Sequence, residues 1–270
     1  LGHTHRERVP VSWWDIDMNG EDWLTECRTA IDAGYTSFKT KARPWFDLDV
    51  QLDTVCSHIP EWFDLDLDFN GLLVDPAHAT RVIASLEGRT NVAILETPIP
   101  QHDVDGMRRL RRATSIPMAM HYGSPSFPVV VAEDLCDGFV VGGGASRVTR
   151  SAAAVAEANK IFWLQLVGTG ITAAWSVQLG AVLSHARWPA VNCHQLYVDT
   201  IVRPQMTVED GMTRVPDAPG LGVELADVER YRIEAKEKPY PHPNLLIAIR
   251  WPSGGTTYYA HTRQYWVDFE

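Results

Sequence analysis

Three short polar motifs close successive apolar runs early in the chain. They are Lys39-Thr40-Lys41, Asp68-Phe69-Asn70 and Glu96-Thr97-Pro98. The motifs are evenly spaced, with 27 residues from Lys41 to Asp68 and 28 from Asp68 to Glu96. That interval fits one β-strand, one helix and two loops. The spacing therefore predicts consecutive βα units whose polar strand ends meet at one end of a sheet or barrel.

The alternation of strand-like and helix-like segments continues for about eight repeats. Short apolar runs predict strands at residues 9–14, 37–41, 65–70, 92–97, 117–122, 138–142, 162–167 and 190–196. Helical segments lie between them, at residues 21–33, 75–88, 146–159 and 171–186 among others. The strand runs lack strict polar–apolar alternation, which is typical of parallel strands buried on both faces. The pattern predicts an α/β fold, a modified TIM-type (β/α) barrel.

The pattern changes after about residue 196, where Pro, Gly and Tyr become frequent. We therefore predict a barrel over residues 1–202 and a C-terminal extension over residues 203–270, with strand-like pieces at 245–251 and 256–260. A chain of 270 residues is long enough for one barrel of this class. We expect the extension to pack on the barrel or on a capping domain that is missing from the chain.

Charge and cysteine content exclude several classes of partner. The net charge of −10 argues against a nucleic acid or an anionic membrane as partner, because both attract basic surfaces. The four cysteines are far apart and form no C-x-x-C pair, which indicates reduced thiols in a cytoplasmic protein. No apolar stretch reaches 18 residues, and the first residues do not form a signal peptide. A small molecule is therefore the expected ligand.

Residues at the carboxyl ends of barrel strands form the active site in enzymes of this class. Seven of the eight expected strand ends carry a titratable or hydrogen-bonding group. These groups include Lys39 and Lys41, Asp68 and Asn70, Glu96, His121 and Tyr122, Asp137, Gln165, and His194 and Gln195. A lysine pair beside two carboxylates suggests proton chemistry at a carbon held next to a metal.

The order of these motifs resembles the enolase superfamily, in particular its mandelate racemase and muconate lactonizing branch. The resemblance rests on K-x-K at Lys39, D-x-N at Asp68, E-x-P at Glu96 and D-x-x-x-x-G-G at Asp137. A P-x-x-P-G-x-G segment at residues 216–222 adds to it, and the similarity runs from residue 1 to about 225. Each motif alone is weak, whereas their order and spacing together are specific.

The resemblance implies a mechanism and a set of site residues. Mg²⁺ would bind a substrate carboxylate, a base would remove the neighbouring α-proton, and the metal would stabilise the enediolate. The metal ligands would be Asp68, Glu96 and His121. The catalytic residues would be Lys41 as base, Lys39 and Asp137. The substrate-binding residues would be Asn70, Tyr122, Gln165 and Gln195. The resemblance also favours a homo-oligomer and implies a capping domain that the chain does not show.

Several positions depart from the family pattern. His121 and Tyr122 stand where a third metal carboxylate is expected, so the Mg²⁺ site should be weakened. Gln165 replaces the histidine base of the racemases, and Gln195 replaces an acidic hydrogen-bond donor. Neither glutamine can shuttle a proton.

Four functions remain open at this point. A dehydratase-type lyase that uses one lysine base on a hydroxy or sugar acid agrees best with these substitutions. The alternatives are a racemase or cycloisomerase, an impaired homologue that binds a ligand or has a structural role, and a barrel that uses His121 and His194 with a transition metal.

Overall fold

The computed structural model describes residues 2–232, 246–250 and 256–260. The chain divides into two compact units, residues 1–226 and 227–270. In the second unit, β12 (Leu246–Arg250) and β13 (Thr256–Ala260) form an antiparallel pair, preceded by the 3-10 turn η2 (Glu229–Tyr231). The strand-like pieces expected near residues 245 and 256 are thus confirmed within the described residues. The extension predicted over residues 203–270 is divided between the two units.

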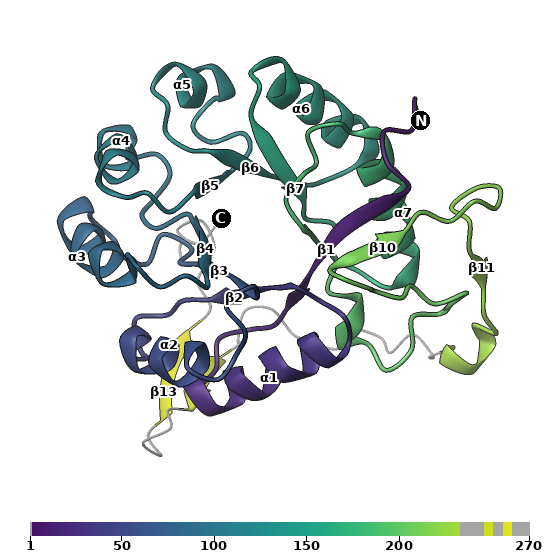
Figure 1. Cartoon of the computed structure of the whole chain (residues 1–270), viewed down its shortest axis with the longest axis horizontal. Helices are drawn as coiled ribbons and strands as arrows, with labels where there is room; N and C mark the ends of the chain where they lie inside the picture. Colours follow the sequence, from purple (N-terminus) through teal and green to yellow (C-terminus); the bar gives the residue numbers. More distant parts are fainter. Residues whose placement is uncertain (1, 233–245, 251–255, 261–270) are drawn as a thin grey trace. The chain divides into compact units, whose positions relative to one another are not determined.

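The first unit is a barrel in which strands and helices alternate along the chain (Figure 1). The barrel strands are β1 (Arg8–Trp14), β2 (Ser37–Lys41), β3 (Asp64–Asp68), β4 (Val92–Glu96), β5 (Met118–His121), β6 (Gly138–Val141), β7 (Ile161–Leu164) and β8 (Ala190–Val191). The helices are α1 (Gly20–Asp32), α2 (Leu48–Cys56), α3 (Pro76–Leu86), α4 (Val104–Ala113), α5 (Phe127–Ala132), α6 (Ala145–Glu157) and α7 (Gly170–Val182). The predicted barrel class is confirmed.

Parallel pairing joins β1 to β7 in sequence order, and the short strand β8 closes the ring. Val11 pairs with Ala190, and Ser12 pairs with Val191. On its other side, Val191 bridges to Gln165, which directly follows β7. The described part of the first unit also contains an antiparallel pair outside the ring, β9 (Val202–Arg203) with β11 (Glu224–Leu225). A further strand, β10 (Met212–Arg214), pairs antiparallel with β1.

The last barrel strand is shorter than the residues 190–196 predicted from the sequence. After Val191, Cys193 adopts a left-handed backbone conformation with φ of 56°. The 3-10 turn η1 (His194–Leu196) follows it. A left-handed residue breaks an extended strand, so Gln195 lies on a turn.

Side-chain caps explain where several helices begin. The side chains of Asn19, Asp47, Asp75 and Asp103 each accept a hydrogen bond from a backbone N–H of the helix that follows. Gly34 ends the turn after α1 with φ of 87°, and a Cβ there would lie 2.3 Å from the carbonyl oxygen of Val208. Only glycine fits this close approach.

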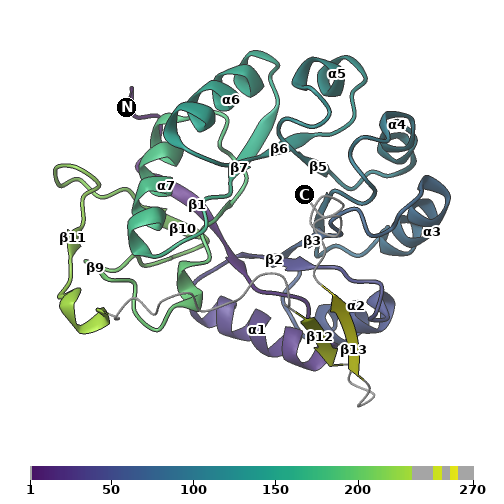
Figure 2. The same cartoon turned by 180° about the vertical axis from the view of Figure 1, so that it is seen from behind.

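Residues on the strands alternate between two apolar layers. On β5, Met118 and Met120 belong to the large core that packs beneath the helices, whereas Ala119 packs within a smaller cluster inside the barrel. Because side chains on a strand alternate in direction, His121 shares the inner face with Ala119. The reverse view shows the same ring with the helices outside it (Figure 2). None of the described helices is long and apolar enough to cross a membrane.

Candidate active site

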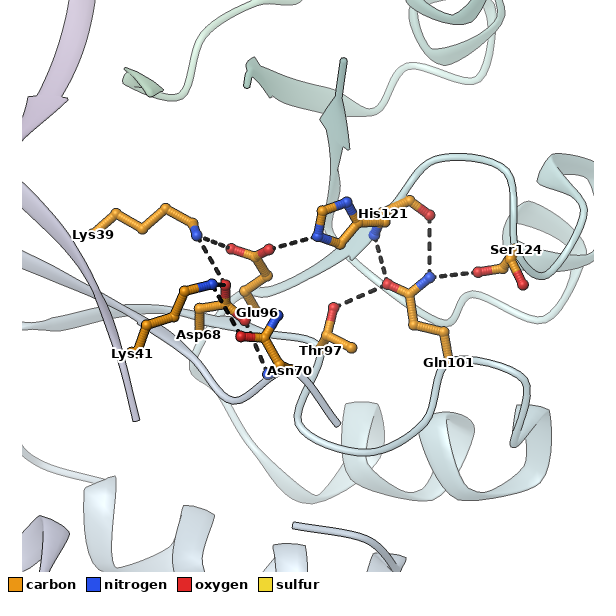
Figure 3. A network of polar contacts seen from close by, with 9 residues as sticks. All are labelled: Lys39, Lys41, Asp68, Asn70, Glu96, Thr97, Gln101, His121 and Ser124. Atoms are coloured by element: carbon orange, nitrogen blue, oxygen red, sulfur yellow. Dashed lines mark hydrogen bonds and ion pairs between the residues drawn. The ribbon is translucent and has the colours of Figure 1, made fainter. Parts of the chain in front are cut away.

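The carboxyl ends of four neighbouring strands bring together Lys39, Lys41, Asp68, Glu96 and His121 (Figure 3). The strands are β2, β3, β4 and β5, and their register places Lys41 opposite Asp68 and Asp68 opposite Glu96. Since the strands are parallel, these side chains meet at one end of the barrel. The polar cluster expected from the spacing of the sequence motifs is therefore present.

Lys39 bridges the two carboxylates. Its Nζ lies 3.0 Å from Asp68 Oδ2 and 2.8 Å from Glu96 Oε2. All three side chains are buried, with exposed fractions of 1%, 2% and 0%. Burial alone would lower the pKa of Lys39, but the carboxylates of Asp68 and Glu96 outweigh it and raise that pKa. The ammonium is therefore firmly charged.

Lys41 reaches the same carboxylate from nearer the surface. Its Nζ donates to Asp68 Oδ2 at 2.5 Å and to Asn70 Oδ1 at 2.9 Å. The backbone N–H of Asn70 donates to the other oxygen of Asp68, at 2.9 Å. Burial would raise the pKa of Asp68, but the two lysines reverse this effect and hold it well below its usual range.

His121 completes the cluster from β5. Its Nε2 lies 2.9 Å from Glu96 Oε1, and its side chain is 45% exposed. Neither Glu96 oxygen makes a hydrogen bond of good geometry; Glu96 forms an ion pair with Lys39 and a close polar contact with His121. Glu96 thus faces a donor group on each side.

Gln101, which the sequence analysis did not identify, fixes the loops around His121. Its Oε1 accepts from the backbone N–H of His121 at 2.6 Å and from the Thr97 hydroxyl at 2.9 Å. Its Nε2 donates to the carbonyls of His121 and Ser124. The E-x-P motif and the next strand end are thereby tied together (Figure 3). No sequence signal distinguishes this glutamine from an ordinary loop residue.

A second residue missed from the sequence is Asp66. It lies two positions before Asp68 on β3, so both side chains point to the inside of the barrel. It is buried, and this burial raises its pKa to about 8. At pH 7 this carboxyl is therefore largely protonated. The alternation of side chains along a strand would have predicted from the sequence that Asp66 shares the inner face with Asp68.

A cavity of about 420 Å³ opens beside the two lysines. Lys39, Lys41 and Gln165 form its polar part. The rest of its lining is Trp14, Val167, Val191, Cys193, Leu196 and Tyr197. The Oε1 atom of Gln165 is buried without a hydrogen-bond partner, so it is free to accept from a ligand. The cavity combines two lysine side chains and an amide with a largely apolar wall.

Asp137, expected to be catalytic, lies at the opposite end of the barrel. It directly precedes β6, and its Oδ2 accepts from the backbone N–H of Met118, the first residue of β5. Its Oδ1 lies 2.5 Å from Arg111 of α4. Because the polar cluster is at the carboxyl ends of the strands, Asp137 cannot reach it. The prediction was wrong because this aspartate begins its strand instead of ending it.

Two of the predicted substrate-binding residues also lie elsewhere. The ring of Tyr122 packs against Phe127 and Phe139 in the apolar layer outside the barrel strands, because it follows the inward-facing His121. Gln195 donates from Nε2 to the carbonyl of Trp14 at 2.7 Å and does not line the cavity beside the lysines. The structure therefore does not place Tyr122 and Gln195 at the cavity. The other two predicted residues lie near the lysines: Asn70 contacts Lys41, and Gln165 lines the cavity.

His194 does not join His121. It lies on η1 and lines other cavities, together with residues such as Thr200 and Gln205. Its side chain is buried, and burial lowers its pKa to about 4. The arrangement does not support a metal site shared by these two histidines.

The divalent metal implied by the family resemblance requires Asp68, Glu96 and His121 to surround one cation. In the structure every oxygen of the two carboxylates already faces a lysine, the imidazole or a backbone N–H. Within the described residues, no three His, Cys, Asp or Glu side chains are grouped closely enough to hold a metal. As arranged, the three residues do not fit a divalent metal.

Comparisons with known proteins agree with the motifs. The chain matches the family described as "Enolase C-terminal domain-like" over residues 22–229. An N-succinyl-L-Arg/Lys racemase from Bacillus cereus is 26% identical over 127 residues, which cover 47% of this chain and 34% of the relative. The chain thus spans about a third of the length of that relative.

Solved structures show the same fold. The 2-chloromuconate cycloisomerase from Rhodococcus opacus has a TM-score of 0.72 at 22% identity, covering 86% of this chain and 66% of its own. A mandelate racemase/muconate lactonizing family protein from Azoarcus sp. has a TM-score of 0.74 at 24% identity. The match covers 87% of this chain and 68% of that protein. Together with the ordered motifs and the barrel, the matched profile shows that this chain belongs to the enolase C-terminal domain-like family, in the mandelate racemase and muconate lactonizing branch of the enolase superfamily.

Proposed function

We propose that this chain is an enzyme that removes an α-proton from a small carboxylate, with Lys41 as the base. One observation carries the proposal: Lys41 and Lys39 line a 420 Å³ cavity at the carboxyl ends of the barrel strands. Relatives named as a racemase and a cycloisomerase support this class of chemistry.

The residues suggest how the reaction proceeds. The substrate carboxylate lies against the ammonium of Lys39 and the side chain of Gln165. Lys41 first releases its own proton to solvent; as a free amine it takes the α-proton, and the C–H electron pair moves into the carboxylate to form an enediolate. The ammonium of Lys39, buried where water cannot screen it, stabilises the developing charge.

Within this class we propose dehydration of a hydroxy or sugar acid. Lys41 returns the proton to the β-hydroxyl, which leaves as water while the electron pair forms the C=C bond of an enol. One base is enough for this sequence. Racemisation requires a second base on the other face, and Gln165, which lines the cavity, cannot serve as one.

Members of the enolase superfamily typically bind a divalent metal. A weakly bound Mg²⁺ at Asp68 and Glu96 was expected from the resemblance, but these residues do not fit it as arranged. No step of the proposed mechanism is therefore assigned to a metal.

The test is to incubate the protein in D₂O with a panel of hydroxy and sugar acids, with Mg²⁺ and with EDTA. We expect deuterium at the α-carbon of at least one acid, or loss of water from it. Lys41→Ala should abolish the reaction. Lys160→Ala, which removes a lysine paired with Asp134 away from the site, is the matched control. If no acid in the panel shows either deuterium exchange or dehydration, the proposal is refuted.

A second candidate is a carboxylate-binding protein without turnover. It is favoured by the contacts of Lys41 with Asp68 and Asn70, which occupy the nitrogen that would have to act as the base. Trp14 lines the cavity, so its fluorescence reports binding. Quenching by a carboxylate without deuterium exchange would identify this function.

The setting of the reaction is also a proposal. We propose a homo-oligomer in the cytoplasm that contacts neither nucleic acid nor membrane. The family resemblance, the net charge of −10 and the unpaired thiols support it. Light scattering on the purified chain measures the oligomeric state.

A further inference from the structure

We infer that the Lys39 ammonium is the resident cation of this site and that it keeps divalent metals out of the position between Asp68 and Glu96. The inference concerns metal binding alone, so it does not depend on the proposed reaction.

Lys39 extends from β2, and its Nζ lies within 3.0 Å of an oxygen from each of the next two strands, β3 and β4. A metal ligated by both carboxylates would lie between the same oxygens. The ammonium and a metal therefore compete for one position.

Lys39 and Lys41 balance the two carboxylates of Asp68 and Glu96 before any metal is added. A divalent cation would leave two uncompensated positive charges among buried side chains, which is costly. It could bind only if Lys39 moved away and found another partner.

His121 supplies an imidazole in the sequence position where the family pattern has a carboxylate, and it contacts Glu96 through Nε2. It adds no negative charge to attract a cation. Mg²⁺ also prefers oxygen ligands.

The experiment compares the wild type with Lys39→Met, a variant of similar length without the charge. Protein stripped with EDTA is titrated with Mg²⁺ by calorimetry and with Mn²⁺ by electron paramagnetic resonance. We expect the wild type to bind neither ion below about 1 mM, and Lys39→Met to bind at least about tenfold more tightly. Added metal should also raise the Tm of Lys39→Met but leave the wild type unchanged.

Two control variants separate bridging from simple charge removal. Lys41→Met removes the same charge, but the carboxylate contact of Lys41 is with Asp68 alone, so Lys39 still bridges and metal affinity should stay low. Lys39→Arg keeps a cation between the carboxylates and should also exclude metals.

Three outcomes would overturn the inference: wild-type binding of Mg²⁺ or Mn²⁺ below about 100 µM, an equal gain in Lys41→Met, or folded Lys39→Met with unchanged affinity. If Lys39→Met is unfolded without metal, recovery of its circular dichroism on adding Mn²⁺ supports the inference. In the absence of recovery, the wild-type titration decides: no binding supports the inference and tight binding refutes it.

Discussion

Lys39 Nζ lies 2.8 Å from Glu96 Oε2, although the two residues belong to strands that are not neighbours. Asp68, on the strand between them, contacts the same ammonium at 3.0 Å. A single side chain thus links β2, β3 and β4 inside the barrel. The removal of one member of a buried ionic group leaves the others without compensation, so this linkage should govern stability.

Lys39→Met should lower the free energy of unfolding by about 3–5 kcal/mol in EDTA, because Glu96 loses its ammonium partner in a buried environment. Lys41→Met should cost less, since Lys41 is more exposed and Asp68 keeps Lys39. Urea denaturation of both variants measures the difference. Equal losses would contradict the bridging role.

His194 should make the protein sensitive to acid. Its pKa is about 4 in the fold, against an ordinary value of 6.5, so the unfolded state binds more protons between these pH values. The buried neutral ring of His194 makes its whole contribution to the free energy of unfolding above pH 6.5. That free energy falls by about 3 kcal/mol as the pH drops to 4. His194→Gln should remove this part of the pH dependence, whereas His78→Gln, at an exposed position, should not. Parallel pH curves for His194→Gln and the wild type would refute the prediction.

Asp137→Ala distinguishes a structural role of this residue from a catalytic one. The variant loses the Arg111 pair and the acceptor for the Met118 amide, and both contacts are at the amino end of the strands. We expect a loss of about 1–3 kcal/mol in stability with no change in carboxylate binding. Denaturation and Trp fluorescence titrations measure the two effects separately. If a folded variant bound carboxylates more weakly, Asp137 would have a role in the binding site after all.

Gln101→Ala should loosen the loop that carries His121. The variant removes four hydrogen bonds to Thr97, His121 and Ser124. A loss of about 1.4 kcal/mol in local stability would speed amide exchange of His121 about tenfold. Gln101→Glu keeps the two acceptor contacts and should show an intermediate rate. An unchanged rate in the alanine variant would mean that the strand alone holds His121.

The sequence predicted the barrel well because the repeating interval of strand and helix is a long-range signal. It also placed Lys39, Lys41, Asp68 and Glu96 correctly at strand ends, since these residues close apolar runs. Errors arose where the bounds of a strand decide which end or which face a residue occupies. A shift of one residue moves a side chain to the other face, as Tyr122 shows.

Other features depend on contacts that no local pattern contains. Gln101 acts through the backbone of His121 and Ser124, which approach it only after two loops have folded. The ammonium of Lys39 lies between two carboxylates because three strands pair in register. Gln195 lies outside the predicted site because the chain turns at Cys193. The left-handed conformation of this cysteine has no sequence signal.

The late position of β8 in the sequence affects how the protein folds during its synthesis. Val11 pairs with Ala190, so the ring of strands is sealed by residues almost at opposite ends of the barrel sequence. During synthesis on the ribosome, this edge of β1 remains without its β8 partner until residues 190 and 191 emerge. An unpaired strand edge can pair with another chain, so the nascent protein is open to aggregation through this edge during that interval.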